Sequence, residues 1–126
     1  MKTLVVDDSA VMRKVLIGAL SRAEITDVDQ AADGAEAVAA AGKNDYGLVL
    51  MDWNMPNMLG IDAVRGIRAL GKTMPIIMVT TEAEKSRIID AIKAGANNYI
   101  IKPFEPGTIV SKIQDALAKV DRRAHV

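Results

Sequence analysis

Residues 3–8 read TLVVDD, and this short stretch favours a strand that ends in two carboxylates. A continuous apolar run without polar alternation is typical of a strand that is buried on both faces of a sheet. The same arrangement recurs along the chain: LVLM at 48–51 precedes Asp52, IIMV at 76–79 precedes Thr80, and YII at 99–101 precedes Lys102. With a weaker strand expected at 28–31, the sequence predicts five strands, four of which end in chemically active residues.

Amphipathic helical segments separate the expected strands. One begins after Ser9, a plausible N-cap, and an alanine-rich one opens at Asp33-Gly34 and stops at Gly42. Three more helices are expected: one begins after residue 60, one ends at Gly95, and one runs from about 106 to 121. Their apolar stripes are Met12, Val15, Leu16, Ala19 and Leu20; Ile61, Val64, Ile67 and Leu70; Ile88, Ile89 and Ile92; and Ile109, Ile113, Leu117 and Val120. This repeated β–α unit predicts an α/β fold, a doubly wound five-stranded parallel sheet with helices on both faces.

Composition narrows the class of protein. A chain of 126 residues that is 50% hydrophobic fits a single domain over 1–126, with no output domain attached. The absence of cysteine excludes disulfides and thiolate chemistry, and the one histidine, His125, cannot by itself build a metal site or a catalytic triad. No stretch resembles a signal peptide or a membrane helix, and zero net charge argues against DNA binding. A cytoplasmic protein with no direct DNA or membrane contact is expected.

Charge is distributed unevenly along the chain. Acidic residues predominate in the first half and basic residues in the second. Two interpretations stay open: scatter between solvated faces, or an acidic half that attracts cations and a basic half that faces an acidic partner.

Polar residues gather where the strands end. Open α/β sheets bind ligands at the carboxyl ends of their strands, which here carry Asp7, Asp8, Asp52, Thr80 and Lys102. Each residue alone could be a helix cap or a solvated side chain. Three carboxylates on adjacent strands repel one another unless a cation lies among them, and Mg²⁺ suits oxygen donors. The edge could therefore hold a phosphoryl group, with Asp52 as the nucleophile of an acyl-phosphate reaction.

Four motifs in order carry a family resemblance: DD at 7–8, MDWNMPNM at 51–58, VTT at 79–81 and YIIKPF at 99–104. Together they resemble the receiver domain of two-component response regulators, most of all its stand-alone chemotaxis members. The likeness covers the whole chain and implies a flavodoxin-like sheet of order 2-1-3-4-5. It also implies a signalling switch that catalyses only its own phosphorylation and dephosphorylation.

The resemblance implies a role for each matched site residue. Asp52 would accept a phosphoryl group from a histidine kinase. Mg²⁺ would be bound by Asp8, Asp52 and the backbone carbonyl of Asn54, with Asp7 assisting through the metal's water shell. Lys102 would pair with phosphoryl oxygens, and its bond to the next proline would be cis, as in the family.

Further roles concern switching and signal lifetime. Thr80 would be the switch hydroxyl and Tyr99 the switch aromatic. Asn54 and Glu82 flank the approach of the hydrolytic water, so a short-lived phosphoryl group is expected. The alternatives are that Tyr99 is simply a half-buried strand aromatic and that Glu82 only offsets a helix dipole.

The resemblance places an output face on the fourth helix, fifth strand and fifth helix. It includes Ile101, Phe104, Thr108 and Lys112, although Phe104 could instead be a core residue. The partners implied are a histidine kinase, a protein target such as a flagellar motor component, and a phosphatase; the protein is expected to be a monomer.

One departure and three alternatives remain. Leu59-Gly60 stands where the family commonly has Asp-Gly, so the third helix loses a potential N-cap. Within the family, a phosphate sink or phosphorelay carrier is possible. A haloacid-dehalogenase-type phosphatase would need an Asp where Asn54 stands, and a flavodoxin-type cofactor binder would need a phosphate loop in place of DDSA at 7–10. The sequence does not identify the kinase or the regulated process.

Overall fold

The computed structural model describes the backbone of residues 1–124 and the side chains of residues 1–119, so His125 and the side chain of Val120 lie outside the described residues. Among these residues, five parallel strands form one sheet in the order β2-β1-β3-β4-β5. The strands are β1 (Thr3–Val6), β2 (Val28–Ala31), β3 (Leu48–Met51), β4 (Ile76–Thr80) and β5 (Asn98–Ile101). The predicted fold and strand order are confirmed.

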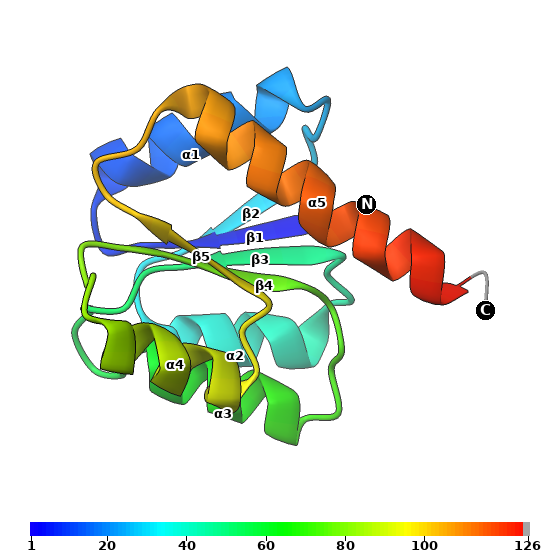
Figure 1. The fold of residues 1–126 in the computed structure, drawn as a ribbon. Coiled ribbons are helices and arrows are strands. Elements are labelled where there is room, and N and C mark those ends of the chain that lie inside the picture. Colours follow the sequence, from blue (N-terminus) through cyan, green and yellow to red (C-terminus); the bar gives the residue numbers. More distant parts are fainter. Residues whose placement is uncertain (125–126) are drawn as a thin grey trace.

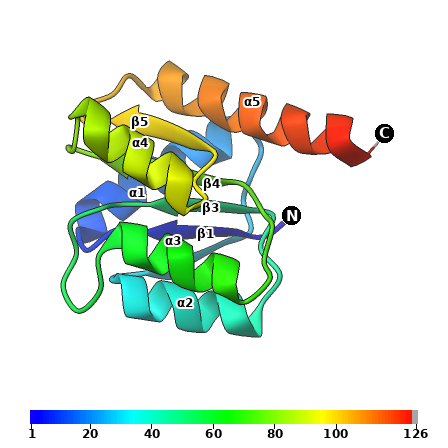
Figure 2. The same cartoon turned by 60° about the horizontal axis from the view of Figure 1, so that its bottom comes forward.

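Helices cover both faces of the sheet, as the repeated β–α unit predicts. One face carries α1 (Ala10–Arg22) and α5 (Pro106–Ala124); the other carries α2 (Gly34–Lys43), α3 (Gly60–Ala69) and α4 (Lys85–Ala94), as Figures 1 and 2 show. Every residue of β1, β3 and β4 is buried, because these strands are central and covered on both sides. Their side chains alternate between two apolar cores, one under each helical layer.

Capping residues fix several helix ends. The hydroxyl of Ser9 accepts a hydrogen bond from the N–H of Met12 at 3.2 Å, and Asp33 accepts one from the N–H of Glu36 at 2.8 Å. Gly95 ends α4 with a φ of 121°, a conformation that favours glycine. No side chain caps α3, whose N-cap is Leu59, so the expected loss of that cap is confirmed.

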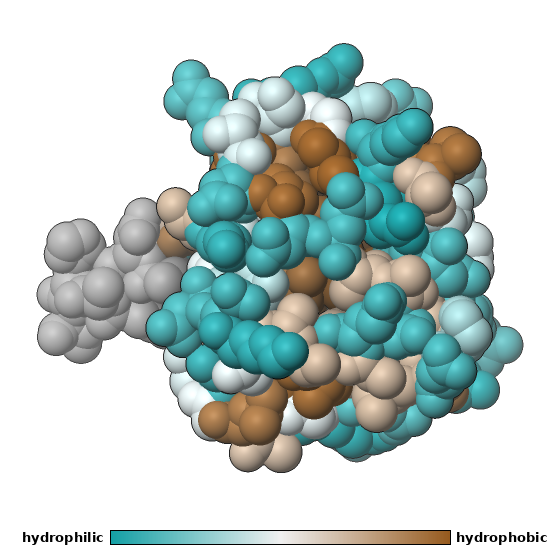
Figure 3. Space-filling view, turned by 180° about the vertical axis from the view of Figure 1, so that it is seen from behind, coloured by the Kyte–Doolittle hydropathy of each residue, from teal (hydrophilic) through white to brown (hydrophobic). Residues whose placement is uncertain are grey.

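Parts of the expected apolar stripes face solvent. Val15 and Leu70 are exposed, as are Ile89 and Ile92. Leu70 follows the last residue of α3, so it no longer faces the sheet, and α4 buries little of its surface in the core. In the face shown in Figure 3, apolar side chains form small patches separated by hydrophilic residues. No helix of the described chain is long and apolar enough to span a membrane.

Candidate functional site

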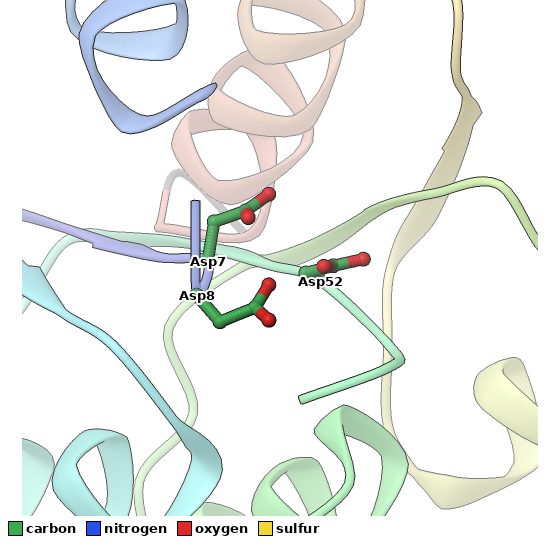
Figure 4. Close-up of side chains that lie close together, drawn as sticks. All are labelled: Asp7, Asp8 and Asp52. Carbon is green, nitrogen blue, oxygen red and sulfur yellow. The ribbon is translucent and has the colours of Figure 1, made fainter. Parts of the chain in front are cut away.

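The register of the sheet brings the acidic residues together. Val6 is paired with Met51, so Asp7 and Asp52 leave neighbouring strands at the same level. The N–H of Asp52 donates to the carbonyl of Val6 at 2.9 Å, which extends the pairing to the site. One oxygen each of Asp7, Asp8 and Asp52 lie within 4.8 Å of one another, and Figure 4 shows the three side chains on the same side of the strand ends.

Lys102 joins the acidic cluster from the end of β5. Its Nζ lies 2.8 Å from Oδ2 of Asp7 and 3.6 Å from Oδ1 of Asp52. The backbone N–H of Lys102 donates to the carbonyl of Thr80, which fixes the chain beyond β5, and the bond to Pro103 is cis, as expected. The sheet thus places one ammonium group against two buried carboxylates.

Electrostatics at the site remain unbalanced despite Lys102. Burial raises the pKa of Asp52, Lys102 lowers it, and the neighbouring charge of Asp7 raises it again, with a net shift upward. Three carboxylates therefore lie near one ammonium group; Asp7 and Asp52 are buried, while Asp8 is exposed. A hard cation would offset this repulsion, and the donors present are carboxylate and carbonyl oxygens, which suit Mg²⁺. The residues present therefore fit the expected metal.

Thr80 and Tyr99 lie one behind the other on neighbouring strands. Thr80 is fully buried at the end of β4, and its Oγ1 accepts a hydrogen bond from the N–H of Glu82 at 3.3 Å. The side chain of Tyr99 is only 8% exposed and donates from its hydroxyl to the carbonyl of Glu82 at 2.6 Å. Tyr99 is thus buried rather than half-buried, and it is bonded to the loop that follows Thr80.

Asn54 and Glu82 meet above the site. Asn54 Nδ2 donates to Oε1 of Glu82 at 3.2 Å, which joins the loop after β3 to the loop after β4. Asn54 is exposed and Glu82 is partly exposed, so solvent reaches this pair. The structure brings together the two residues that the sequence placed near a hydrolytic water.

The expected output residues differ in their exposure. Ile101 and Thr108 are exposed, and Lys112 donates to Oδ1 of Asn98 at 3.4 Å. Phe104 is partly buried and packs against the core layer under α1 and α5. The geometry thus favours the core interpretation of Phe104, because its ring contacts the layer opposite α4.

Three supporting contacts were missed at the sequence level. The guanidinium of Arg87 lies over the ring of Trp53, 5.8 Å from its centroid, and Asn57 donates to Asp33 at 2.7 Å. Gly60 donates its N–H to the carbonyl of Trp53 at 2.8 Å and packs against the backbone of Asp52. Gly60, which directly follows the atypical Leu59, was the sequence signal that could have indicated its close approach to Asp52. The Arg87–Trp53 and Asn57–Asp33 contacts join residues that are far apart in the sequence and had no such signal.

Comparison with known proteins agrees with this geometry. A family model described as the response regulator receiver domain matches residues 3–114. The chain belongs to the receiver domain family. Receiver domains act in signalling rather than as enzymes of intermediary metabolism, and the family covers the whole sheet and every residue of the site.

Individual relatives are similar over nearly the full chain. A chemotaxis protein CheY homolog of Campylobacter jejuni is 48% identical over 120 residues, covering 93% of this chain and 92% of the relative. The chemotaxis protein CheY1 of Helicobacter pylori strain J99 is 46% identical over 124 residues, covering 96% and 100%. Among solved structures, Vibrio cholerae CheY4 has a TM-score of 0.83 at 36% identity, covering 91% of this chain and 97% of that one. A CheY-like receiver of Methanospirillum hungatei has a TM-score of 0.89 at 29% identity, covering 97% of each chain.

Proposed function

We propose that this protein is a phosphorylation-dependent switch of a two-component chemotaxis system, with Asp52 as the phosphoacceptor. The observation that carries the proposal is the convergence of Asp7, Asp8 and Asp52 within 4.8 Å, with the Lys102 ammonium group against two of them. The names of the Campylobacter and Helicobacter relatives support chemotaxis as the process.

The reaction transfers a phosphoryl group from a phosphohistidine of a histidine kinase. An oxygen of the Asp52 carboxylate forms a bond to phosphorus while the phosphorus–nitrogen bond breaks, and the imidazole keeps that electron pair. Lys102 binds phosphoryl oxygens, and the hydroxyl of Thr80 donates a hydrogen bond to one of them.

The acidic side of the site would hold the metal. Asp8, Asp52 and the backbone carbonyl of Asn54 would be its protein ligands, and Asp7 would assist through bound water. When bound, Mg²⁺ offsets the negative charge of the carboxylates and of the transferred group. Asp7 also keeps Lys102 in place. Its Oδ2 contacts the ammonium group, while its Oδ1 accepts a hydrogen bond from the N–H of Ser9 at 2.9 Å, which fixes the carboxylate.

Phosphorylation alters the output face through Thr80 and Tyr99. The phosphoryl group adds negative charge and three acceptor oxygens beside Thr80. When Thr80 donates to one of them, the loop carrying Glu82 follows, and Tyr99, which is bonded to that loop, shifts with it. A protein target that binds the surface around Ile101, Thr108 and Lys112 reads this change, and by linkage such a target favours phosphorylation.

Asn54 and Glu82 hold the water that hydrolyses the phosphoryl group, so the signal is short-lived. The protein acts as a single receiver module over residues 1–126, as a cytoplasmic monomer. Its partners are a histidine kinase, a target such as a flagellar motor component, and a phosphatase.

Acetyl phosphate tests the assignment without a kinase. With Mg²⁺, the parent protein should gain one phosphoryl group that hydroxylamine removes, as an acyl phosphate requires, and Asp52→Asn should gain none. Asp62→Asn is the matched control, because Asp62 is an exposed acid on α3 that pairs with Arg65. Labelling of Asp52→Asn at the parent's rate would show that another residue is the acceptor.

A further inference from the structure

Helix α4 has little apolar packing to hold it in place. Of its ten residues, all of them described, only Ala91 is buried; Ile88 and Ala94 are partly buried against the core, while Ile89 and Ile92 face solvent. In Figure 1 the helix lies beside α3 at the β4–β5 end of the sheet. Burial of apolar surface normally fixes a helix against its sheet. Because α4 has little of it, the contacts at its two ends contribute more to its position.

Arg68 of α3 holds the C-terminal end of α4. Its guanidinium donates to the carbonyl of Gly95 at 3.1 and 2.8 Å and to Oδ1 of Asn97 at 2.9 Å. The same group donates to the carbonyl of Lys72 at 3.0 Å, so it also ties the loop that follows α3 to the C-terminal end of α4. Burial lowers the pKa of Arg68, in keeping with a cation whose recorded partners are neutral. This end of α4 is fixed by several hydrogen bonds.

Arg87 makes a different contact at the N-terminal end. It lies in the first turn of α4 and places its guanidinium over the ring of Trp53. Trp53 is only 3% exposed and directly follows Asp52, to whose Oδ1 it donates its backbone N–H at 2.8 Å. The contact therefore joins the first turn of α4 to the segment that carries the phosphoacceptor.

The charge of the same guanidinium also acts on the switch aromatic. The pKa of Tyr99 is raised to about 12, chiefly by burial and also by the charges of Glu82 and Asp52, while the charge of Arg87 lowers it. Arg87 thus contacts the ring of Trp53, and its charge also influences Tyr99. The hydroxyl of Tyr99 donates to the carbonyl of Glu82, which lies in the loop between β4 and α4.

We propose that Arg87 is a positioning residue that latches the first turn of α4 onto Trp53 and so favours the arrangement in which Tyr99 is buried and bonded to Glu82. This inference rests on the proposed function and adds to it the contact between Arg87 and Trp53. Since Arg68 holds the far end, loss of the latch releases the end of α4 nearest the phosphoacceptor. By linkage, a contact that favours this arrangement also favours binding of a phosphoryl group at Asp52.

The test measures binding of beryllofluoride, a tetrahedral phosphoryl mimic, in the presence of Mg²⁺. Trp53 is the sole tryptophan of the chain, so its fluorescence reports binding, and the midpoint of the titration gives the affinity whatever the starting intensity. Arg87→Met removes the charge but keeps an apolar stem, and should weaken binding about two- to fivefold, the range of an exposed cation–π contact. Arg87→Lys, which keeps a cation, should fall between Arg87→Met and the parent.

Lys93→Met is the matched control, since Lys93 is an exposed cation near the other end of the same helix. It should bind the mimic as the parent does. Acrylamide quenching of Trp53 in metal-free protein should rise in Arg87→Met and not in Lys93→Met. A parent that does not bind beryllofluoride would overturn the proposed function. A parent that binds it with the same affinity as Arg87→Met would leave the proposed function intact and overturn the latch.

Discussion

Gly60 offers a sharp test of how the site is built, because its hydrogen atom faces the backbone of Asp52. A β-carbon at this position would overlap the carbonyl oxygen of Asp52 and lie 2.8 Å from its carbonyl carbon and 3.0 Å from the α-carbon of Trp53. Ordinary contacts between such atoms are about 3.5–4.0 Å. Gly60→Ala therefore requires the backbone of Asp52 or of α3 to move by roughly an ångström or more.

The magnitude follows from the kind of atoms involved. Overpacking a core typically costs about 1–3 kcal/mol, and the upper part of that range applies because backbone atoms cannot rotate away as side chains do. For a domain of this size 1 kcal/mol corresponds to about 4 °C, so a cost of about 2–3 kcal/mol lowers the melting temperature by about 8–12 °C. Labelling of Asp52 by acetyl phosphate should also slow, because the displaced atoms belong to the acceptor itself.

Gly18→Ala is the opposite case and serves as the control. A β-carbon at Gly18 meets nothing within 4 Å, and the residue lies inside α1. Alanine there should raise the free energy of unfolding by about 0.5–1 kcal/mol, because glycine loses more backbone entropy in a helix. Thermal or urea unfolding measures both variants. If Gly60→Ala were as stable as the parent and labelled at the parent's rate, the close approach to Asp52 would not constrain the site.

Three further expectations concern the metal, the signal lifetime and the tyrosines. Mg²⁺ should change the fluorescence of Trp53, and Asp8→Ala should need at least tenfold more Mg²⁺, on the order of a lost charged ligand; an unaltered titration would remove Asp8 from the metal site. Asn54→Lys should lengthen the life of the phosphoryl group by blocking the water's approach, and equally fast loss at intact Mg²⁺ affinity would argue against that role. Tyr46 and Tyr99 both have their pKa raised to about 12, chiefly by burial, so their ultraviolet titration in the folded protein should lie well above the ordinary value of 10.0. Because both pKa values are higher in the folded state, the stability they contribute is present below pH 10 and is lost as the pH rises towards about 12; a tyrosinate step near 10 in the folded protein would contradict their burial.

The fold and the acidic site could be predicted from the sequence because both depend on local pattern. Apolar runs without alternation identify central parallel strands, and strand order then fixes which strand ends are neighbours. Asp7 and Asp52 are separated by more than forty residues, yet each follows such a run directly, so their meeting needed only the parallel arrangement. Caps at Ser9 and Asp33 were recognisable for the same reason, since a cap bonds within a few residues of itself.

What the sequence did not predict depends on side chains that reach across the fold. Arg87 and Trp53 are both ordinary in their local context, because an arginine in an amphipathic helix is usually a solvated residue. Ile89 and Ile92 fit a helical stripe, but their exposure depends on how far α4 extends over the sheet. Phe104 ends the motif YIIKPF, and the sequence is compatible with a side chain that faces either solvent or the core. In the fold, the path of the chain into α5 turns it towards the α1 layer.

The acidic cluster explains why function opposes stability in this domain. A core position such as that of Asp52 would be occupied more favourably by an uncharged side chain, as its raised pKa shows. Lys102 lies against Asp7 and Asp52, and backbone hydrogen bonds at the ends of β1 and β3 keep these two carboxylates close although they repel. The repulsion is therefore stored in a rigid part of the sheet, where neither strand can move apart without breaking backbone hydrogen bonds. A cation or the Lys102 ammonium group lowers that energy at once, without any rearrangement of the backbone, and this is why the carboxylates are built on strand ends rather than on mobile loops.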